Sequence, residues 1–362
     1  MKRSGPLCAN GAEYLYTDDD DYLWKTGGSN MIAEYRKMWE ARNWLKKNEP
    51  FLPTWQAYVG YRLDLFHKLA GGATLESLAE NYGYEETLLS SWADTGIVLG
   101  HLKQDGGRLV PSKKMLKFFS QESDHSVGEL LKELFEMHMP SLMNYPQMIT
   151  SNQKGRFNGE DFGKTVAATS ALIEKKAFGH VLSEINAQKP RWVLDIGCGT
   201  GGYLIKLADK IKQGTFVGVD ISKECIEEAR QKVRKKSLGE KVKFYYADIN
   251  TWEVPSRFFD VIMMNNLLHY YSQDARKELL ARVSKLISQN GTVIMITPLY
   301  LERGGQRFSA AFNSFMEAHE NLYPLPRKDE LIRDAEEAGL QLKSIKTVVR
   351  EGSWYCVNFS KK

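Results

Sequence analysis

The stretch that decides the fold is Trp192-Val-Leu-Asp-Ile-Gly-Cys-Gly-Thr-Gly-Gly202. It reads as an apolar strand that runs into a glycine turn at the start of a helix. Glycines at such a turn let the backbone bend tightly and let a ligand come close to the main chain. Gly197, Gly199 and Gly202 also satisfy the pattern G-x-G-x-x-G, so the turn by itself does not exclude a nicotinamide or flavin ligand.

Strand and helix patterns alternate from this stretch onward. The predicted strands cover 191–196, 215–220, 242–247, 259–265 and 292–297, and the predicted helices between them cover 202–210, 222–236 and 273–288. Such alternation is typical of a parallel sheet with helices on both faces. We therefore predict an α/β, Rossmann-like, doubly wound sheet.

Three carboxylates lie at the ends of predicted strands; Asp195 and Asp248 narrow the choice of ligand, whereas a carboxylate in the position of Asp220 is shared with dinucleotide-binding folds. Asp220 ends the second strand, 23 residues after Gly197, where a carboxylate can accept both hydroxyls of a ribose. Asp195 precedes the first glycine, where it suits a cationic ligand and would repel a pyrophosphate. Asp248 follows the third strand and suits an adenine amine, with Ile249 against the ring. The pattern favours a positively charged nucleoside.

Together with Phe259-Asp-Val-Ile-Met-Met-Asn-Asn-Leu-Leu-His-Tyr-Tyr271, these motifs match class I methyltransferases. The whole chain resembles the winged-helix small-molecule methyltransferases of the caffeate and hydroxyneurosporene O-methyltransferase type. Residues 191–297 carry the specific motifs, and the front from about 31 to 120 matches more loosely. The resemblance implies S-adenosylmethionine as cofactor, a small-molecule acceptor and a role in small-molecule biosynthesis. The cofactor-binding residues that the resemblance implies are Gly197, Gly199, Gly201, Asp220, Asp248 and Ile249, with Asn265 at the methyl-donor end. The neighbouring Asp195 and Ile221 complete the predicted set.

His269 is the candidate for chemistry. Methyl transfer to a hydroxyl requires alignment and removal of a proton. In the plant-type relatives this loop reads His-Asp-Trp and the histidine is the general base. Here it reads His269-Tyr-Tyr, and the position of a second family carboxylate falls near Leu325-Pro-Arg327. We predict O-methylation with His269 as base or acceptor-orienting group; the alternative is a loop histidine with no catalytic role.

A second reading is methylation of carbon in a 2-oxo acid. His269 and His319 would then hold a metal, with Glu317 or Glu320 completing the ligands. The primary prediction includes no metal, and nitrogen is not excluded as the acceptor atom. Four residues are predicted to touch the acceptor, and they are His319, Glu320, Met139 and Met143. The methionines belong to a Met- and aromatic-rich stretch that can equally pack a core or a dimer interface.

The front of the chain reads as helical. We divide the chain into an N-terminal arm (1–30), a winged-helix dimerisation domain (31–141), linking helices (142–190) and the cofactor-binding domain (191–362). Helices are predicted over 58–69, over 74–81 with Thr74 as N-cap and over 85–94, and a hairpin over 101–111. Apolar helices without evident cover predict a homodimer. Aromatic residues in the arm, such as Tyr14 and Trp24, leave room for docking on a partner.

Composition excludes several functions. The predicted reading helix, 85–94, carries three acids and no Lys or Arg, and the net charge is only +4 from 49 basic and 45 acidic residues. Nucleic-acid binding is therefore not expected. Four scattered cysteines, no signal peptide and no membrane-length apolar run predict a soluble, cytoplasmic protein. A ligand-sensing winged-helix regulator and a nicotinamide oxidoreductase stay as rival readings.

Overall fold

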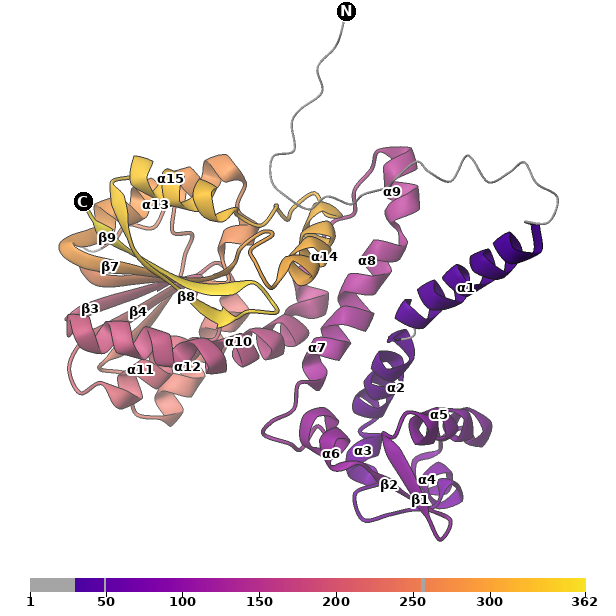
Figure 1. Ribbon diagram of the computed structural model, residues 1–362. Coiled ribbons are helices and arrows are strands. Elements are labelled where there is room, and N and C mark those ends of the chain that lie inside the picture. Colours follow the sequence, from indigo (N-terminus) through magenta and orange to yellow (C-terminus); the bar gives the residue numbers. More distant parts are fainter. Residues whose placement is uncertain (1–29, 49, 255–257) are drawn as a thin grey trace, which may run out of the picture. The chain divides into compact units, whose positions relative to one another are not determined.

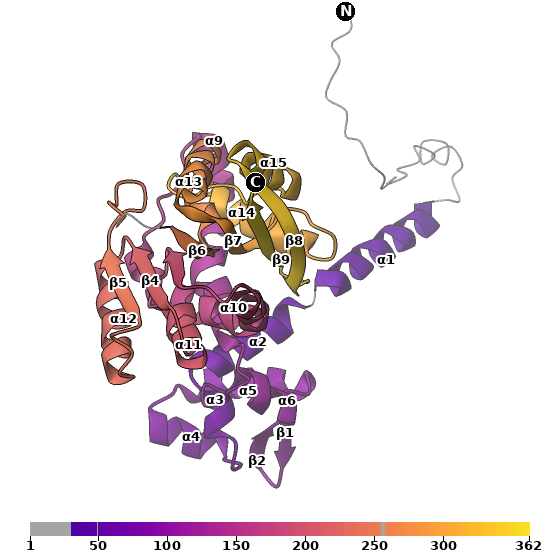
Figure 2. The same ribbon diagram turned by 90° about the vertical axis from the view of Figure 1, so that its left-hand side faces the viewer.

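The computed structural model describes residues 30–48, 50–254 and 258–362. Seven strands in this part of the chain form one sheet in the order β5-β4-β3-β6-β7-β9-β8. Strands β3 to β7 are parallel, whereas β9 runs antiparallel to both β7 and β8. The strands are β3 (Trp192–Ile196), β4 (Thr215–Asp220), β5 (Val242–Tyr246), β6 (Phe259–Asn265), β7 (Ile287–Pro298), β8 (Leu340–Val349) and β9 (Trp354–Lys361). Figure 2 shows β5 at one edge of the sheet and β8 at the other.

Helices cover both faces of the sheet, as Figure 1 shows. Helices α10 (Gly159–Gln188), α11 (Gly202–Lys210) and α12 (Lys223–Lys235) bury apolar side chains on one face, and α13 (Gln273–Leu286) and α15 (Lys328–Glu337) on the other. The central strands are buried on both faces, which explains their nearly continuous apolar runs. The predicted Rossmann-like, doubly wound fold is confirmed, although the sequence did not reveal the antiparallel pair β8 and β9.

The order of the sheet places a ligand site beside β3. This strand pairs with β4 on one side and with β6 on the other, so the direction of chain progression reverses there. In open α/β sheets, ligands bind beyond the carboxyl ends of the strands at this switch point. The glycine turn follows β3, and the Asn265 loop follows β6.

A small helical module precedes the sheet. It consists of α2 (Phe51–Arg62), α3 (Leu65–Lys68), α4 (Leu75–Tyr82), α5 (Glu86–Val98), β1 (Leu102–Asp105), β2 (Arg108–Pro111) and α6 (Lys113–Phe119). The Thr74 N-cap is confirmed, since its hydroxyl accepts a bond from Ser77 N at 3.2 Å. The prediction of one helix over 58–69 is wrong. The helix is interrupted at Asp64, which adopts φ 51° and whose carboxylate accepts a bond from Gln121 N at 3.1 Å. The helices and hairpin fit the predicted order, and the winged-helix interpretation stays a prediction.

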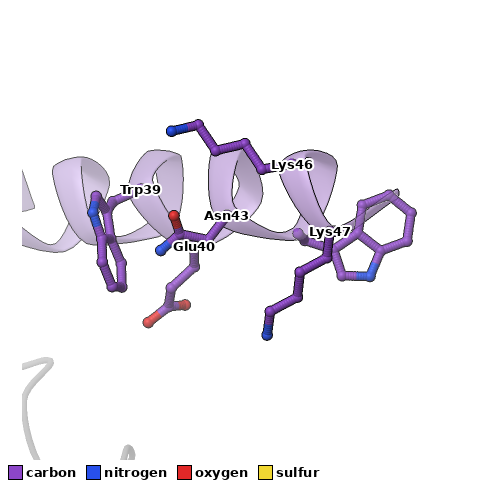
Figure 3. A pocket seen from close by; sticks show the side chains of 6 residues that line it. Trp39, Glu40, Asn43, Lys46 and Lys47 are labelled. Carbon is purple, nitrogen blue, oxygen red and sulfur yellow. The ribbon is translucent and has the colours of Figure 1, made fainter. Parts of the chain in front are cut away.

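The chain divides into two compact units between Gln56 and Ala57. The described part of the first unit holds α1 (Asn30–Asn48) and the start of α2. Figure 3 shows the side chains of α1 that line a surface hollow, among them Trp39, Glu40 and Lys47, and all of them come from this single helix. The predicted arm lies outside the described residues up to position 29. None of the helices in the described residues is long and apolar enough to span a membrane.

Short helices connect the module to the sheet, and most of them begin before residue 142, where the predicted linking helices begin. They are α7 (Gly128–Lys132), the π-helical segment η2 (Glu133–His138), α8 (Met139–Met143) and α9 (Tyr145–Ser151). An aromatic core forms where Met137 of η2 and Phe157 pack with Phe312 and Phe315 of α14 (Gln306–Glu317). This core lies next to the histidines described below.

Candidate functional site

The glycine turn after β3 has a shape that only glycine allows at two of its positions. Gly197, Gly199 and Gly201 all have positive φ, at 68°, 50° and 77°. A Cβ on Gly201 would lie 2.3 Å from the Phe244 ring, and one on Gly197 would lie 2.7 Å from Leu267. A Cβ on Gly199 would meet nothing within 4 Å. The turn is therefore tight on one side and open to a ligand at Gly199.

Asp195 is a buried carboxylate at the end of β3. It is 2% exposed, and its Oδ1 accepts a bond from Asn265 Nδ2 at 3.2 Å. Burial and the charge of nearby Glu174 hold the pKa of Asp195 well above its usual range, and Asp220 adds to the rise, against the lowering effect of the Asn265 bond. A cationic group bound here would relieve this cost. A pyrophosphate would increase it.

Glu174 is a second carboxylate at the turn, and sequence reasoning missed it. Its Oε2 would lie 2.3 Å from a Cβ placed on Gly202, so the carboxylate sits against the first residue of α11. Its Oε1 lies 2.7 Å from Lys206 Nζ. Glu174 lies within the long helix α10, which precedes β3 in the chain. Nothing in the sequence around it identifies it as a site residue. Only the packing of α10 on the sheet brings it to the site.

The ends of β4 and β5 carry the other predicted cofactor residues. Asp220 accepts bonds from Gly199 N and Ser222 N, each at 2.8 Å, which leaves each carboxylate oxygen a further lone pair. Asp248 is exposed, and its Oδ1 accepts bonds from the backbone and side chain of Asn250. Ile221 is 73% exposed beside Asp220, whereas Ile249 is buried in the core. The exposed Ile221 offers more apolar surface to a flat ring than Ile249 does.

The loop after β6 holds three buried polar atoms without a hydrogen bond to any described residue. They are Asn265 Oδ1, Asn266 Oδ1 and His269 Nδ1. Buried polar atoms in folded proteins are nearly always paired, so a group of such atoms within five residues marks a place where a ligand supplies the partner. These atoms follow the strand beside the glycine turn, at the switch point of the sheet.

His269 lies on the short helix η3 (Leu268–Tyr270) and is buried. Burial and, to a lesser extent, the positive charge of Arg276 together lower the pKa of His269 to about 3. Arg276 holds η3 in place, because its guanidinium donates to the carbonyls of Leu268, Tyr271 and Pro324. The ring of His269 is therefore neutral and fixed.

Two further histidines gather around the rings of α14. His138 lies 4.4 Å from Phe315 and 5.6 Å from Phe312, measured between ring centroids. His319 lies 4.7 Å from Phe315, and His269 lies 6.0 Å from Phe312. We call these five residues the histidine–phenylalanine cluster.

The other predicted acceptor-binding residues divide into two groups. His319 belongs to the cluster, but both of its ring nitrogens have partners, since Nδ1 contacts Phe315 O at 2.8 Å and Nε2 contacts Ser141 Oγ at 3.3 Å. Met139 is half-buried, whereas Glu320 and Met143 are exposed. Within the described part of the chain, no three His, Cys, Asp or Glu side chains form a group that could hold a metal.

Comparison with known proteins begins with the sequence. A family model described as a methyltransferase domain matches residues 193–291. The mRNA cap guanine-N(7) methyltransferase of Schizosaccharomyces pombe is 31% identical over 154 residues, which cover 38% of this chain and 42% of that protein. The aklanonic acid methyltransferase DauC of a Streptomyces species is 31% identical over 109 residues, or 30% of this chain and 48% of that one. The chain thus spans less than half the length of these two relatives.

Solved structures match nearly the whole chain at low identity. An O-methyltransferase family protein from Burkholderia thailandensis superposes with a TM-score of 0.73 at 18% identity, covering 89% of this chain and 98% of that one. The O-methyltransferase NcsB1 from neocarzinostatin biosynthesis, solved with S-adenosylmethionine and 2-hydroxy-5-methyl naphthoic acid, gives 0.68 at 15% identity, covering 86% and 96%. At these identities the likeness establishes a shared fold.

Proposed function

Since residues 193–291 are a methyltransferase domain on a Rossmann-like sheet, we propose that the chain is an S-adenosylmethionine-dependent methyltransferase that acts on a small-molecule acceptor. The observation that carries this proposal is Asp195, a buried carboxylate with a raised pKa beside an open glycine turn. A ligand that is both a nucleoside and a cation suits this place, and S-adenosylmethionine is such a ligand. Its sulfonium carries the methyl group that is transferred.

Different residues of the site would contact different parts of the cofactor. Asp220 has free lone pairs for the ribose hydroxyls, and Ile221 offers an apolar surface to the adenine beside it. Asp195 and Glu174 face the positively charged amino-acid end, and Asn265 links Asp195 to the loop that carries His269. Structures of the same fold solved with S-adenosylmethionine support the choice of this cofactor.

We propose oxygen as the acceptor atom, in keeping with the O-methyltransferases among the structures that share the fold. His269 is neutral and its Nδ1 lacks a partner, so it can receive a hydrogen bond from an acceptor hydroxyl. Full proton transfer to His269 would create a cation in a buried place near Arg276. Of the two predicted roles of His269, orienting the acceptor therefore has stronger physical support than acting as the base. For His319 to hold a metal in the carbon-methylation alternative, it would have to give up its bond to Ser141 or Phe315.

The experiment that tests the cofactor site is calorimetric titration with S-adenosylhomocysteine. We expect binding by the wild type and a loss of affinity of tenfold or more in Asp195→Asn and Asp220→Asn. Asp209→Asn, an exposed carboxylate on α11, serves as the matched control and should bind normally. An unliganded wild type, or equal binding by all four proteins, would contradict the proposed function.

Titration of the same proteins with S-adenosylmethionine, whose sulfonium makes it a cation, provides a second measurement through proton release. Because the pKa of Asp195 is raised in the free protein, a bound cation should favour its ionised form and expel a proton. The binding enthalpy should then depend on the ionisation enthalpy of the buffer, and this dependence should be weaker in Asp195→Asn. Identical buffer dependence in both proteins would mean that Asp195 does not meet the charged end of the ligand.

A further inference from the structure

We propose that His138, backed by Glu133, takes the proton from the acceptor hydroxyl during methyl transfer. This proposal rests on the proposed function, because it concerns the acceptor side of the same site. The base then comes from the connecting helices, which precede the sheet in the sequence, and His269 orients the acceptor.

The pair is a carboxylate next to an imidazole, both largely out of solvent. His138 Nε2 lies 3.5 Å from Glu133 Oε1, and the two side chains are 11% and 17% exposed. Nε2 makes no hydrogen bond in the described part of the chain, so a small movement of Glu133 would complete one. Such a carboxylate stabilises an imidazolium, as the histidine of a catalytic triad is stabilised by its acid. Both residues belong to the π-helical segment η2, a rare conformation that is frequent at functional sites.

The pair is connected to His269 through one shared aromatic ring. His138 and His269 flank the same ring, Phe312. Tyr270 lies beside His269, with 4.5 Å between the two ring centroids. Burial raises the pKa of Tyr270 to about 12, and the charges of both Glu133 and Asp220 contribute to the rise. The negative charges of Glu133 and Asp220 therefore both act on the Tyr270 hydroxyl.

The other two histidines of the cluster are less suited to accept a proton. His269 has a cation nearby, Arg276, where a base needs an anion. His319 uses one ring nitrogen on Phe315 O and the other on Ser141 Oγ. Glu133 thus supplies, from a distant part of the sequence, the acid that is absent from the loop His269-Tyr-Tyr.

The step balances as follows. The acceptor O–H bond breaks, and its proton moves to Nδ1 of His138 while Nε2–H points to Glu133. An oxygen lone pair forms the bond to the methyl carbon, and the carbon–sulfur bond breaks with its electrons left on sulfur. The products are the methyl ether, neutral S-adenosylhomocysteine and an imidazolium that later returns its proton to water. A properly placed base contributes about 10²- to 10⁴-fold to such a step.

Turnover of two phenols of similar size distinguishes a residue that acts as a base from one with a structural role only. 4-Methylphenol is neutral at about pH 8.5, like a tyrosine side chain, whereas 4-nitrophenol is already ionised and needs no base. We expect His138→Asn to lower turnover of 4-methylphenol by about 10²-fold or more and that of 4-nitrophenol by only a few-fold. Glu133→Gln should show the same selectivity to a smaller degree. The matched control is Glu136→Gln on the same segment, whose carboxylate faces Tyr58 and Arg62, and it should behave as wild type.

A spectroscopic measurement makes the test independent of turnover. With S-adenosylhomocysteine bound, wild type should shift the ionisation of bound 4-nitrophenol to lower pH, which is visible as phenolate absorbance, and His138→Asn should abolish the shift. Equal losses with both phenols, no loss in either variant, or a shift that survives in His138→Asn would overturn the proposal. Wild type that binds S-adenosylhomocysteine but methylates neither phenol would overturn it as well. A wild type that binds no S-adenosylhomocysteine would instead refute the proposed function.

Discussion

At the scale of single residues, the site contains two buried ionisable groups whose pKa values are both shifted in the direction that favours the neutral form. Burial raises the pKa of the Asp195 acid and lowers that of the His269 imidazole, because it disfavours charge of either sign. The two respond differently to a bound cation. A positive ligand favours the ionised form of Asp195, whereas it makes protonation of His269 still harder. Binding of a cation would therefore favour a negatively charged Asp195 and leave His269 able to accept a hydrogen bond.

The buried His269 predicts an acid limb in the stability of the protein. In the unfolded chain a histidine binds a proton below about pH 6.5, whereas in the folded protein His269 binds one only near pH 3. The unfolded state therefore holds more protons between these values, and stability falls as the pH is lowered through this window. The contribution is about 1.4 kcal/mol per pH unit.

Denaturant unfolding between pH 7 and pH 4 measures this effect. His269→Gln should lose less stability than wild type on acidification, and His125→Gln, an exposed histidine in the front of the chain, should follow the wild-type curve. Parallel curves for all three proteins would show that His269 is accessible to protons in the folded state.

At the scale of elements, two glycines of the same turn are needed for different reasons: Gly201 for the stability of the fold and Gly199 for the approach of the ligand. Alanine at Gly201 combines a positive φ with a clash at 2.3 Å from Phe244, whereas alanine at Gly199 meets open space at a similar φ. We expect Gly201→Ala to cost about 2 to 4 kcal/mol of unfolding free energy, and Gly199→Ala about 1 to 2 kcal/mol.

The order of the two glycine variants should be reversed for ligand affinity: Gly199→Ala should affect binding more, relative to its loss of stability, than Gly201→Ala does. Gly199→Ala should weaken S-adenosylhomocysteine binding at temperatures where the protein is fully folded, because the new methyl group occupies the approach to the backbone. Thermal unfolding and calorimetry on both variants check the ranking. It is contradicted if Gly199→Ala is the less stable of the two, or if it binds as wild type does.

Arg276 connects three elements through main-chain carbonyls, and its removal should loosen η3. Arg276→Met leaves the carbonyls of Leu268, Tyr271 and Pro324 without this donor, and we expect a loss of about 3 kcal/mol. Lys277→Met is the control on the same helix, since its partners Glu337 and Asp334 are contacted from an exposed position. Urea unfolding compares them, and similar midpoints for the two variants would contradict the assigned role.

The sequence predicted the elements of the sheet more reliably than the contacts of the site. Strands such as 259–265 and helices such as 202–210 agree with the structure because their apolar patterns are local. The break at Asp64 was missed because it depends on a bond to Gln121, more than fifty residues away. Glu174, and the pair Glu133 and His138 that we propose as base, were not predicted as site residues for a similar reason. Each reaches the site only through the packing of helices that carry no motif.

At the scale of the whole molecule, the exposed apolar side chains of α1 favour the predicted homodimer. Met38 is 67% exposed, and Trp39 and Trp44 are each 65% exposed, on a helix in the first of the two units. Surfaces of this kind on one helix are typical of protein interfaces. Light scattering after size exclusion should give twice the chain mass of 41.3 kDa.

Charge placed on this surface should weaken the assembly. Met38→Glu combined with Trp39→Glu is expected to shift the mass toward a single chain, whereas Glu40→Gln, which removes a pair with Arg36 on the same helix, should leave it unchanged. A single-chain mass for wild type at micromolar concentration would contradict the dimer.

The position of β9 also affects how the protein is made. This strand is synthesised after β8, yet it fills the place between β7 and β8. Until it has left the ribosome, β7 presents an open edge of unpaired backbone groups, and β8 has no partner in the sheet. Nascent chains in this state are exposed to edge-to-edge association. Slow translation past residue 349, or a shortage of chaperones at that stage, would therefore reduce the yield of folded protein without changing any residue of the site.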